Sequence, residues 1–172
     1  GKSKIFAFAP GARWQTKKWP AEKWIDLAKS VSSGTDAFIA VVGAQNEAGE
    51  CEIILRESSA RGAILAGKLS LMETAALLGM SAALVTNDSA PMHMATAVGT
   101  PVLAIFGPTV KGFGFYPLGP RDQVVERKIA CRPCALHGKD KCPLGHFACM
   151  REIDPSSVYS ALLKAASEGE SR

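Results

Sequence analysis

The sequence has no long apolar run, no long block of one charge and no glycine-rich nucleotide signature. No apolar stretch approaches the roughly 20 residues of a membrane-spanning helix, and Gly1-Lys2-Ser3-Lys4 leads straight into an apolar segment. We therefore expect neither a transmembrane segment nor a signal peptide. Lysine and arginine number 20 against 16 acidic residues, with no aromatic-interleaved basic stripe, so no nucleic-acid partner is expected. The absence of G-x-G-x-x-G and of a P-loop excludes classical dehydrogenases and P-loop NTPases.

The residues that are present are typical of one globular domain. The chain has 172 residues, of which 47% are apolar and 21% charged, and this length is enough to bury a sizeable core. The formal charge of +4 is mild and suits an anionic ligand. We expect residues 1–172 to form a single domain.

Strand patterns alternate with helix patterns along the chain. Strands are predicted at residues 5–9, 37–42, 63–65, 82–85, 102–106 and 124–125, and helices at 20–32, 47–59, 70–80, 91–98 and 155–166. Such alternation, with nearly continuous apolar strands, predicts an α/β fold: a Rossmann-like, mostly parallel sheet with helices on both faces. Ligands of these sheets bind at the carboxyl ends of the strands.

The most informative segment follows the predicted strand 82–85. Asn87, Asp88 and Ser89 precede a helix that begins near Pro91, and His93 lies in its first turn. A helix N-terminus presents free N–H groups and the positive end of a dipole, which favour a phosphate. Ser89 and neighbouring N–H groups, including the one at Ala90, would bind a diphosphate. The alternatives are that the polar residues only cap the helix and that the histidine is a buried helix residue.

Four short motifs carry a resemblance to a known family. They are Pro-Gly-Ala at residues 10–12, Lys-Lys-Trp-Pro at 17–20, Asn-Asp-Ser-Ala-Pro-Met-His at 87–93 and Phe-Gly-Pro-Thr at 106–109. In order and spacing they resemble the ADP-heptose:lipopolysaccharide heptosyltransferases (glycosyltransferase family 9), which are two-domain GT-B enzymes. The family has glycine where this chain has Ala90, a departure that matters if the position needs a positive φ.

The resemblance implies a partial enzyme, because the family has about twice this length. It covers the C-terminal, donor-binding half, and the N-terminal acceptor domain is absent from this chain. It implies a nucleotide-sugar donor, ADP-heptose, inverting transfer to a lipid-linked sugar of the lipopolysaccharide inner core, and a cytoplasmic location at the inner membrane. The general base would be an acidic residue of the missing half, so the isolated chain should bind donor with little transfer. The chemistry needs no cofactor.

The resemblance also assigns roles to single residues. Lys17 matches a lysine that binds the donor phosphates, where its charge would stabilise the leaving diphosphate. His93, from its own place beside the anion site, would bind the donor and could stabilise the same leaving group. Asp88 should face sugar hydroxyls, because a carboxylate repels phosphate. Arg13 and Lys18 would add to or replace the charge of Lys17. An ordinary solvated basic loop is the alternative.

Three polar residues at the same predicted sheet edge have weaker signals. Gln45 or Glu47, after the second strand, would hydrogen-bond ribose or base, unless both are simply solvated. Thr109, after the fifth strand, would close the phosphate site or only shape the turn.

Four cysteines lie together in a loop-rich stretch at residues 131–150. A C-x2-C pair followed by two more cysteines is compatible with structural zinc, although the later spacing is not that of a standard zinc knuckle. The candidate ligands are Cys131, Cys134, Cys142 and Cys149, with His137 and His146 as alternatives. Reduced thiols and disulfides remain open, and a cytosolic compartment argues against disulfides.

Two other functions remain open at this point. One is the half of a nucleotide-sugar epimerase or hydrolase with the same fold, since fold alone does not decide function. The other is a zinc-stapled interaction module without catalysis, which would leave Lys17, Asp88 and His93 without a role.

Overall fold

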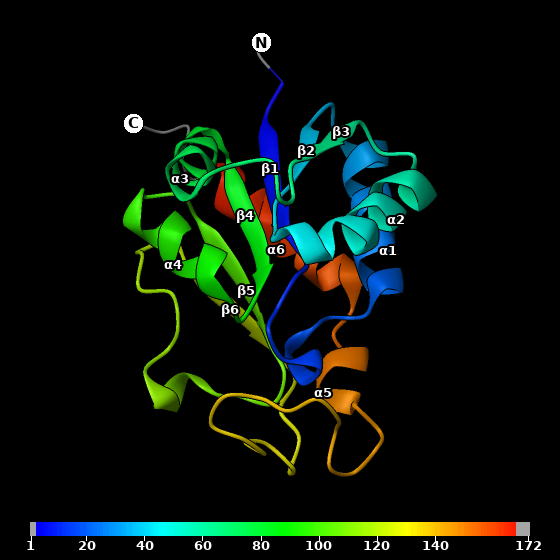
Figure 1. Ribbon diagram of the computed structural model, residues 1–172, viewed down its shortest axis with the longest axis vertical. Helices are drawn as coiled ribbons and strands as arrows, with labels where there is room; N and C mark the ends of the chain where they lie inside the picture. The colour runs from blue at the N-terminus through cyan, green and yellow to red at the C-terminus, as the bar shows by residue number, and fades with distance from the viewer. Residues whose placement is uncertain (1–2, 168–172) are drawn as a thin grey trace.

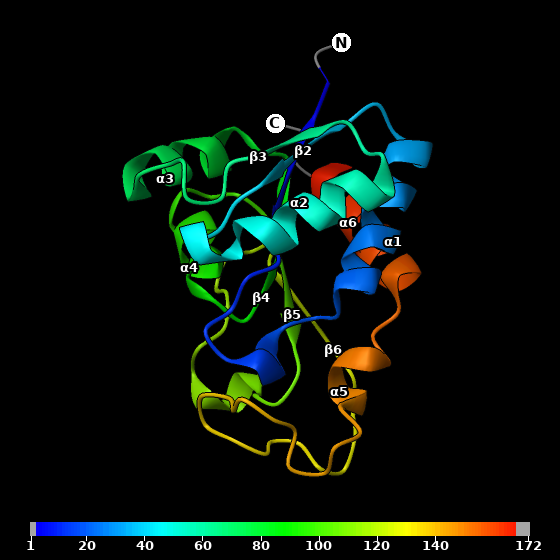
Figure 2. The same cartoon turned by 45° about the vertical axis from the view of Figure 1, so that its right-hand side comes forward.

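The computed structural model describes residues 3–167, which contain one parallel sheet between two layers of helices (Figures 1 and 2). Its six strands run in the order β3-β2-β1-β4-β5-β6, and each neighbouring pair is parallel. The strands are β1 (Ile5–Ala9), β2 (Phe38–Val41), β3 (Gly62–Ile64), β4 (Ala83–Asn87), β5 (Val102–Phe106) and β6 (Gln123–Glu126). The predicted α/β fold with a parallel sheet is confirmed.

The strand order reverses between β1 and β4, which pair from Phe6↔Ala83 to Ala9↔Thr86. An open parallel sheet has a crevice at the carboxyl ends of its strands where the order reverses. The loops that follow β1 and β4 are the segments that carry the first and third sequence motifs. The topology therefore brings these motifs together.

Apolar side chains cover both faces of the sheet. One face packs against α1, α2 and α6 through residues that include Trp24, Ile54 and Val158, and the other packs against α3 and α4. The ring centroids of Phe8 and Trp24 are 5.5 Å apart, and those of Trp19 and Trp24 are 5.4 Å apart. The helices are α1 (Ala21–Gly34), α2 (Ala48–Ser58), α3 (Leu71–Met80), α4 (Ala90–Ala97), α5 (Ala148–Arg151) and α6 (Pro155–Ser167).

The element boundaries differ from the predictions mainly at β4. The predicted strand 82–85 extends to Asn87, which pairs with Ile105 of β5. Thr86 and Asn87 are fully buried and belong to the strand, so the predicted end of the strand at residue 85 was wrong. The predicted cap of α3 is confirmed, because Ser70 and Glu73 form a reciprocal capping box. The short helix α5 was not predicted.

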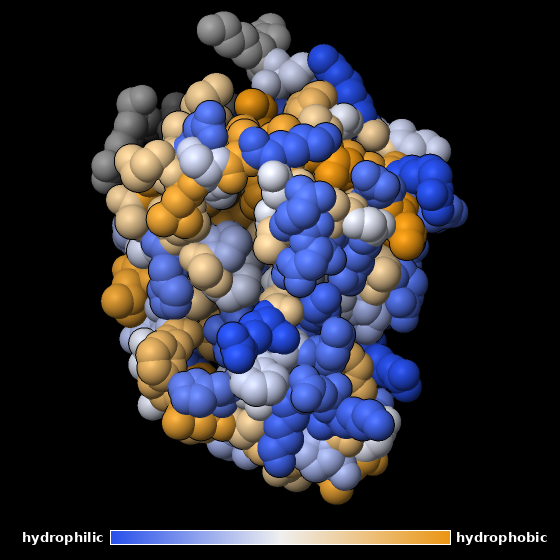
Figure 3. Space-filling view, viewed as in Figure 1, coloured by the Kyte–Doolittle hydropathy of each residue, from blue (hydrophilic) through white to orange (hydrophobic). Residues whose placement is uncertain are grey.

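The surface is uneven in character. Figure 3 shows apolar side chains gathered along the side of the molecule where α3 and α4 lie. Leu71, Met72 and Met80 of α3 are exposed apolar residues. Mostly hydrophilic side chains cover the centre of the same view. None of the helices in the described part of the chain has the length and apolar character that crossing a membrane requires.

Asp122 holds together three elements at the edge of the sheet opposite the crevice. Its carboxylate accepts hydrogen bonds from the backbone N–H of Val102 at 2.9 Å, the Gly119 N–H at 2.7 Å and the Thr96 hydroxyl at 2.8 Å. Thr96 belongs to α4 and Val102 begins β5. One side chain therefore fixes how α4, β5 and the turn before β6 meet.

We expect Asp122→Ala to destabilise the fold because it leaves these donors without their partner. A lost partner costs about 1–3 kcal/mol per buried polar group, so the free energy of unfolding should fall by about 2–3 kcal/mol. Urea denaturation followed by circular dichroism measures the change. The control is Asp26→Ala on the exposed surface of α1, which should stay within about 0.5 kcal/mol. Equal effects of the two substitutions would contradict the role given to Asp122.

Candidate functional site

Asn87 joins the loop after β1 to the end of β4. Its buried amide donates to the Pro10 carbonyl at 2.6 Å and accepts from the Trp19 N–H at 3.1 Å. Because buried polar groups need partners, these two bonds fix both ends of the loop 10–19 against β4. The loop carries Lys17, whose position therefore depends on Asn87.

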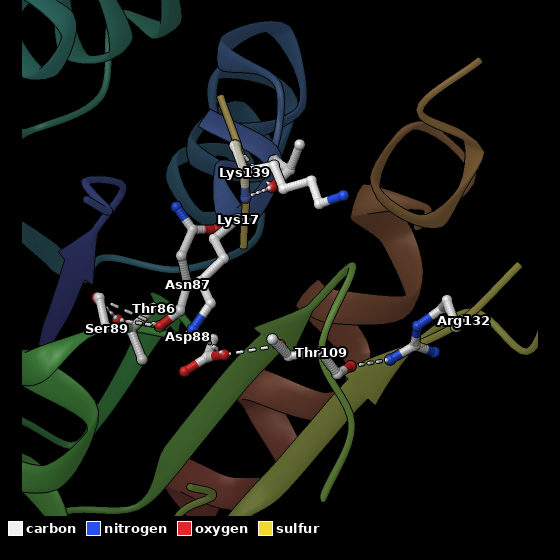
Figure 4. A network of polar contacts seen from close by, with 9 residues as sticks. Lys17, Thr86, Asn87, Asp88, Ser89, Thr109, Arg132 and Lys139 are labelled. Atoms are coloured by element: carbon white, nitrogen blue, oxygen red, sulfur yellow. Dashed lines mark hydrogen bonds and ion pairs between the residues drawn. The ribbon is translucent and has the colours of Figure 1, made fainter. Parts of the chain in front are cut away.

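Lys17 and Asp88 form an ion pair at the carboxyl edge of the sheet. Their Nζ and Oδ2 atoms are 2.6 Å apart, and the side chains are 13% and 7% exposed. The Thr109 hydroxyl donates to the same Oδ2 atom at 2.7 Å, and the guanidinium of Arg132 donates to the Thr109 carbonyl at 2.7 Å. Figure 4 shows this chain of polar contacts running from Lys17 to Arg132. Thr109 therefore positions the carboxylate and does more than shape a turn.

The first turn of α4 begins beside this ion pair. Ser89 is the N-cap residue, but its side chain makes no cap hydrogen bond. Its hydroxyl instead donates to the Asn87 carbonyl at 3.3 Å. The interpretation of Ser89 as an ordinary side-chain cap was therefore wrong, and this side chain leaves the backbone donors of the first turn to other partners. Within residues 3–167, the non-glycine residues with positive φ are Ser59 and Phe147, so Ala90 adopts no conformation that would need glycine.

Two cavities meet at this point. The larger has a volume of about 760 Å³ and extends over Gly11, Val42 and Leu69, and the smaller has a volume of about 310 Å³ and extends toward Phe113 and Phe115. Five residues line both cavities and mark the junction: Lys17, Asp88, Ser89, Ala90 and His137.

The other predicted site residues divide between the two cavities. Arg13 lines the larger one, and its guanidinium lies 5.5 Å from the centre of the Trp14 ring. His93 lines the smaller one and is exposed, so the alternative of a buried helix histidine was wrong. Thr109 lines the smaller one too. Lys18 pairs with Glu50 at 3.1 Å and lines neither cavity.

Of the two candidates after β2, the structure places Glu47 in the site and not Gln45. Gln45 is exposed and lines neither of the two cavities, whereas Glu47 lines the larger one. The Glu47 carboxylate accepts from the Ala44 N–H at 2.8 Å. A Cβ atom at Gly11 would lie 2.1 Å from this carboxylate, so a larger residue there would displace the Glu47 side chain.

Sequence reasoning missed the residues that long loops contribute. Phe113, Phe115 and His137 line the smaller cavity, but they lie outside the predicted periodic elements. His137 was considered only as a metal ligand. His137 lies in a loop between the last predicted strand and the last helix, and such a position does not predict that the residue lines the same cavities as Lys17.

The cysteines are free thiols with different environments. Burial raises the pKa of Cys149 to about 11, and nearby thiolates, Cys134 first, add to this effect. Burial also acts to raise the pKa of Cys142, but backbone hydrogen bonds from residues 144–147 outweigh it and lower the pKa. Within residues 3–167, no three His, Cys, Asp or Glu side chains are arranged to hold a metal ion. Structural zinc therefore stays a prediction.

The fold and the crevice define a Rossmann-like, parallel α/β domain. The family model of glycosyltransferase family 9 (heptosyltransferase) matches residues 1–145. The chain belongs to this family, as the sequence motifs indicated.

Several curated proteins and solved structures similar to this chain are heptosyltransferases. Lipopolysaccharide heptosyltransferase 2 of Salmonella typhimurium is 33% identical over 95% of this chain and 47% of its own length. Lipooligosaccharide heptosyltransferase 2 of Campylobacter jejuni is 30% identical over 90% of this chain and 49% of its own. The solved E. coli ADP-heptose lipopolysaccharide heptosyltransferase II has a TM-score of 0.79 and 24% identity, over 98% of this chain and 48% of that one. The chain thus spans about half the length of the relatives it matches.

We expect Cys142 to be the first of the five thiols to react with iodoacetamide near neutral pH. The thiolate is the nucleophile, and the lowered pKa of Cys142 increases its thiolate fraction at a given pH. Cys149 and Cys51 should react slowly, since burial raises their pKa values to about 11 and about 12. Peptide mass spectrometry of chelator-treated protein measures the order.

The same measurement tests zinc. One equivalent of Zn²⁺ should protect Cys131, Cys134, Cys142 and Cys149 together if they share the ion, and should leave Cys51 unchanged. If Cys149 reacts as fast as Cys142 in chelator-treated protein, the lowered pKa of Cys142 and the raised pKa of Cys149 are contradicted.

Proposed function

We propose that this chain is the donor-binding half of an inverting glycosyltransferase that adds heptose from ADP-heptose to the lipopolysaccharide inner core. One observation carries the proposal. The Lys17–Asp88 pair and the uncapped first turn of α4 meet where a large and a small cavity join. A nucleotide-sugar has the matching order of parts, with a nucleoside and a sugar on either side of a diphosphate.

In this arrangement the nucleoside occupies the larger cavity and the sugar the smaller one. The Glu47 carboxylate would accept hydrogen bonds from ribose hydroxyls in the larger cavity. The diphosphate lies at the junction, where Lys17 and the N–H groups of α4 favour negative charge. Both cavity volumes, about 760 and 310 Å³, fall in the range of small-ligand sites.

Asp88 has a different role from the cations. Its Oδ2 atom is occupied by Lys17 and Thr109, which leaves Oδ1 to accept a sugar hydroxyl. The carboxylate also holds Lys17 in place before the ligand arrives. A preorganised cation of this kind stabilises charge that develops in the transition state without having to move.

Transfer itself needs more than these residues. An acceptor hydroxyl attacks the anomeric carbon, the bond from that carbon to the diphosphate oxygen breaks, and ADP leaves with the electron pair. Lys17, His93 and the first turn of α4 stabilise the departing diphosphate. The proton of the acceptor goes to a general base, which we assign to an acidic residue of an acceptor domain outside this chain. The acceptor is a lipid-linked sugar, and the enzyme works in the cytoplasm at the inner membrane surface.

Structural zinc is a separate proposal with no part in this chemistry. Its support is that the thiols of Cys134, Cys131 and Cys142 all influence the pKa of Cys149, so the four lie in one neighbourhood. Because no three donors converge within residues 3–167, binding a metal ion would require the loop to draw them together.

We expect Lys17→Ala to weaken ADP and ADP-heptose binding about 10- to 100-fold in calorimetric titration. A hydrogen bond to a charged group contributes about 1.5–3 kcal/mol, and each 1.4 kcal/mol is about tenfold in affinity. The substitution also leaves the Asp88 carboxylate facing the diphosphate.

Lys18→Ala is the matched control for Lys17→Ala. It removes a lysine from the neighbouring position, whose partner is Glu50, and it should change affinity less than twofold. UDP should bind more weakly than ADP if the donor is ADP-heptose. Unmodified protein that binds none of the three ligands would overturn the proposed function.

A further inference from the structure

Residues 132–139, which we call the strap, connect the two sides of the candidate site. The strap belongs to the cysteine-rich loop, which lies at the carboxyl ends of the strands in Figures 1 and 2. Both of its ends are hydrogen-bonded to segments that carry site residues. The loop therefore takes part in building the site, whatever its cysteines bind.

The first anchor is Arg132. Its guanidinium donates to the Thr109 carbonyl at 2.7 Å and to the Arg127 carbonyl at 2.6 Å, and pairs with Glu126 at 2.8 Å. The side chain is only 5% exposed. Two residues later, the Cys134 N–H donates to the Pro108 carbonyl at 3.1 Å. This end is fixed to the segment that follows β5, beside the Thr109–Asp88 hydrogen bond.

The second anchor joins Lys139 to the loop that carries Lys17. The Lys139 N–H donates to the Thr16 hydroxyl at 2.8 Å, and the Lys139 carbonyl accepts from the Thr16 N–H at 3.0 Å and from its hydroxyl at 2.8 Å. Gly138 has φ +106°, and a Cβ atom there would lie 2.8 Å from the Cβ of Trp14. Glycine thus lets the strap approach the loop closely, immediately beside His137.

His137 lies between the two anchors and faces the ligand space. It lines both cavities at their junction with Lys17, Asp88, Ser89 and Ala90. The residue is exposed, and its ring centroid is 6.2 Å from that of Phe115. Within residues 3–167 the imidazole has no hydrogen bond or ion pair to another side chain or to the backbone. Its polar atoms remain available to a ligand.

The charges at the junction show why another donor is needed there. Lys17 is already matched by Asp88 at 2.6 Å. The larger cavity has one further acidic residue, Glu47, and one further basic residue, Arg13. A nucleoside diphosphate brings at least two negative charges. The backbone donors of α4 offset part of this charge, and the surplus favours a donor from a second segment. His137 supplies one from the strap, because an imidazole carries an N–H donor in either protonation state.

We propose that His137 is a ligand-binding residue that donates a hydrogen bond to the diphosphate of the donor where the two cavities join. The proposal rests on the proposed function and adds to it a second wall for the diphosphate, held in place by the anchors at Arg132 and Lys139.

The test compares ligands with and without a diphosphate. ADP binding is measured by calorimetry and adenosine binding by ligand-observed NMR titration, on the unmodified chain, His137→Ala and His137→Gln. We expect His137→Ala to weaken ADP about tenfold, as for one hydrogen bond to a charged group, and to change adenosine less than twofold. His137→Gln keeps an N–H donor and should recover part of the loss. His146→Gln is the control, because His146 lies in the same loop but lines neither cavity.

The outcomes separate the inference from the proposed function. Suppose that the unmodified protein binds ADP. If His137→Ala then weakens the binding of ADP and of adenosine equally, or weakens neither, the proposed role of His137 is overturned and the proposed donor site is retained. Equal weakening would mean that the residue only supports the strap. Unmodified protein that binds no ADP overturns both.

Discussion

The geometry of the candidate site depends on the buried amide of Asn87. It donates to the Pro10 carbonyl and accepts from the Trp19 N–H, and no water-exposed alternative is open to it because the residue is fully buried. Any other placement of the loop 10–19 would leave three buried polar groups without partners, each at a cost of about 1–3 kcal/mol. The motif around residues 10–20 and the motif around residues 87–93 are therefore physically dependent on one another. Lys17 meets Asp88 because Asn87 fixes the loop between its two ends.

The sequence was sufficient to predict the parallel sheet, because buried parallel strands and amphipathic helices have different hydrophobic periods. The prediction for the end of β4 was wrong for a physical reason. From the sequence alone, a buried asparagine that ends a strand and bonds a neighbouring loop cannot be told from an asparagine that caps a helix. The pairing with β5 is what extends the strand to Asn87. Lys17 and Asp88 were both predicted in the site, but their contact was not, since it depends on the distant Asn87 bonds. The outcome for Ala90 follows similarly, because its φ is set by the helix that it begins.

The residues that sequence reasoning missed come from segments without periodicity. Phe113, Phe115 and His137 reach the smaller cavity through loops that follow β5 and β6, and nothing in their spacing indicates where those loops turn. Glu47 and Gln45 were equivalent as polar residues after a strand. The short 3-10 turn at Gln45–Glu47 separates them: Glu47 bonds the Ala44 N–H and packs against Gly11, while Gln45 lies against Gly67.

The anchors of the strap relate the cysteine loop to the charge balance of the site. The Arg132 guanidinium donates to the Thr109 carbonyl, the Thr109 hydroxyl donates to the Asp88 carboxylate, and Asp88 pairs with Lys17. Each contact orients the next, so a displacement of Arg132 would shift the Lys17 ammonium group through Thr109 and Asp88. Cys131 and Cys134 flank this arginine, so the cysteine loop begins beside the bonds that orient the site. A loop that has few apolar residues to fix it gains its order here from hydrogen bonds to the site, and the site gains its second wall from the same bonds.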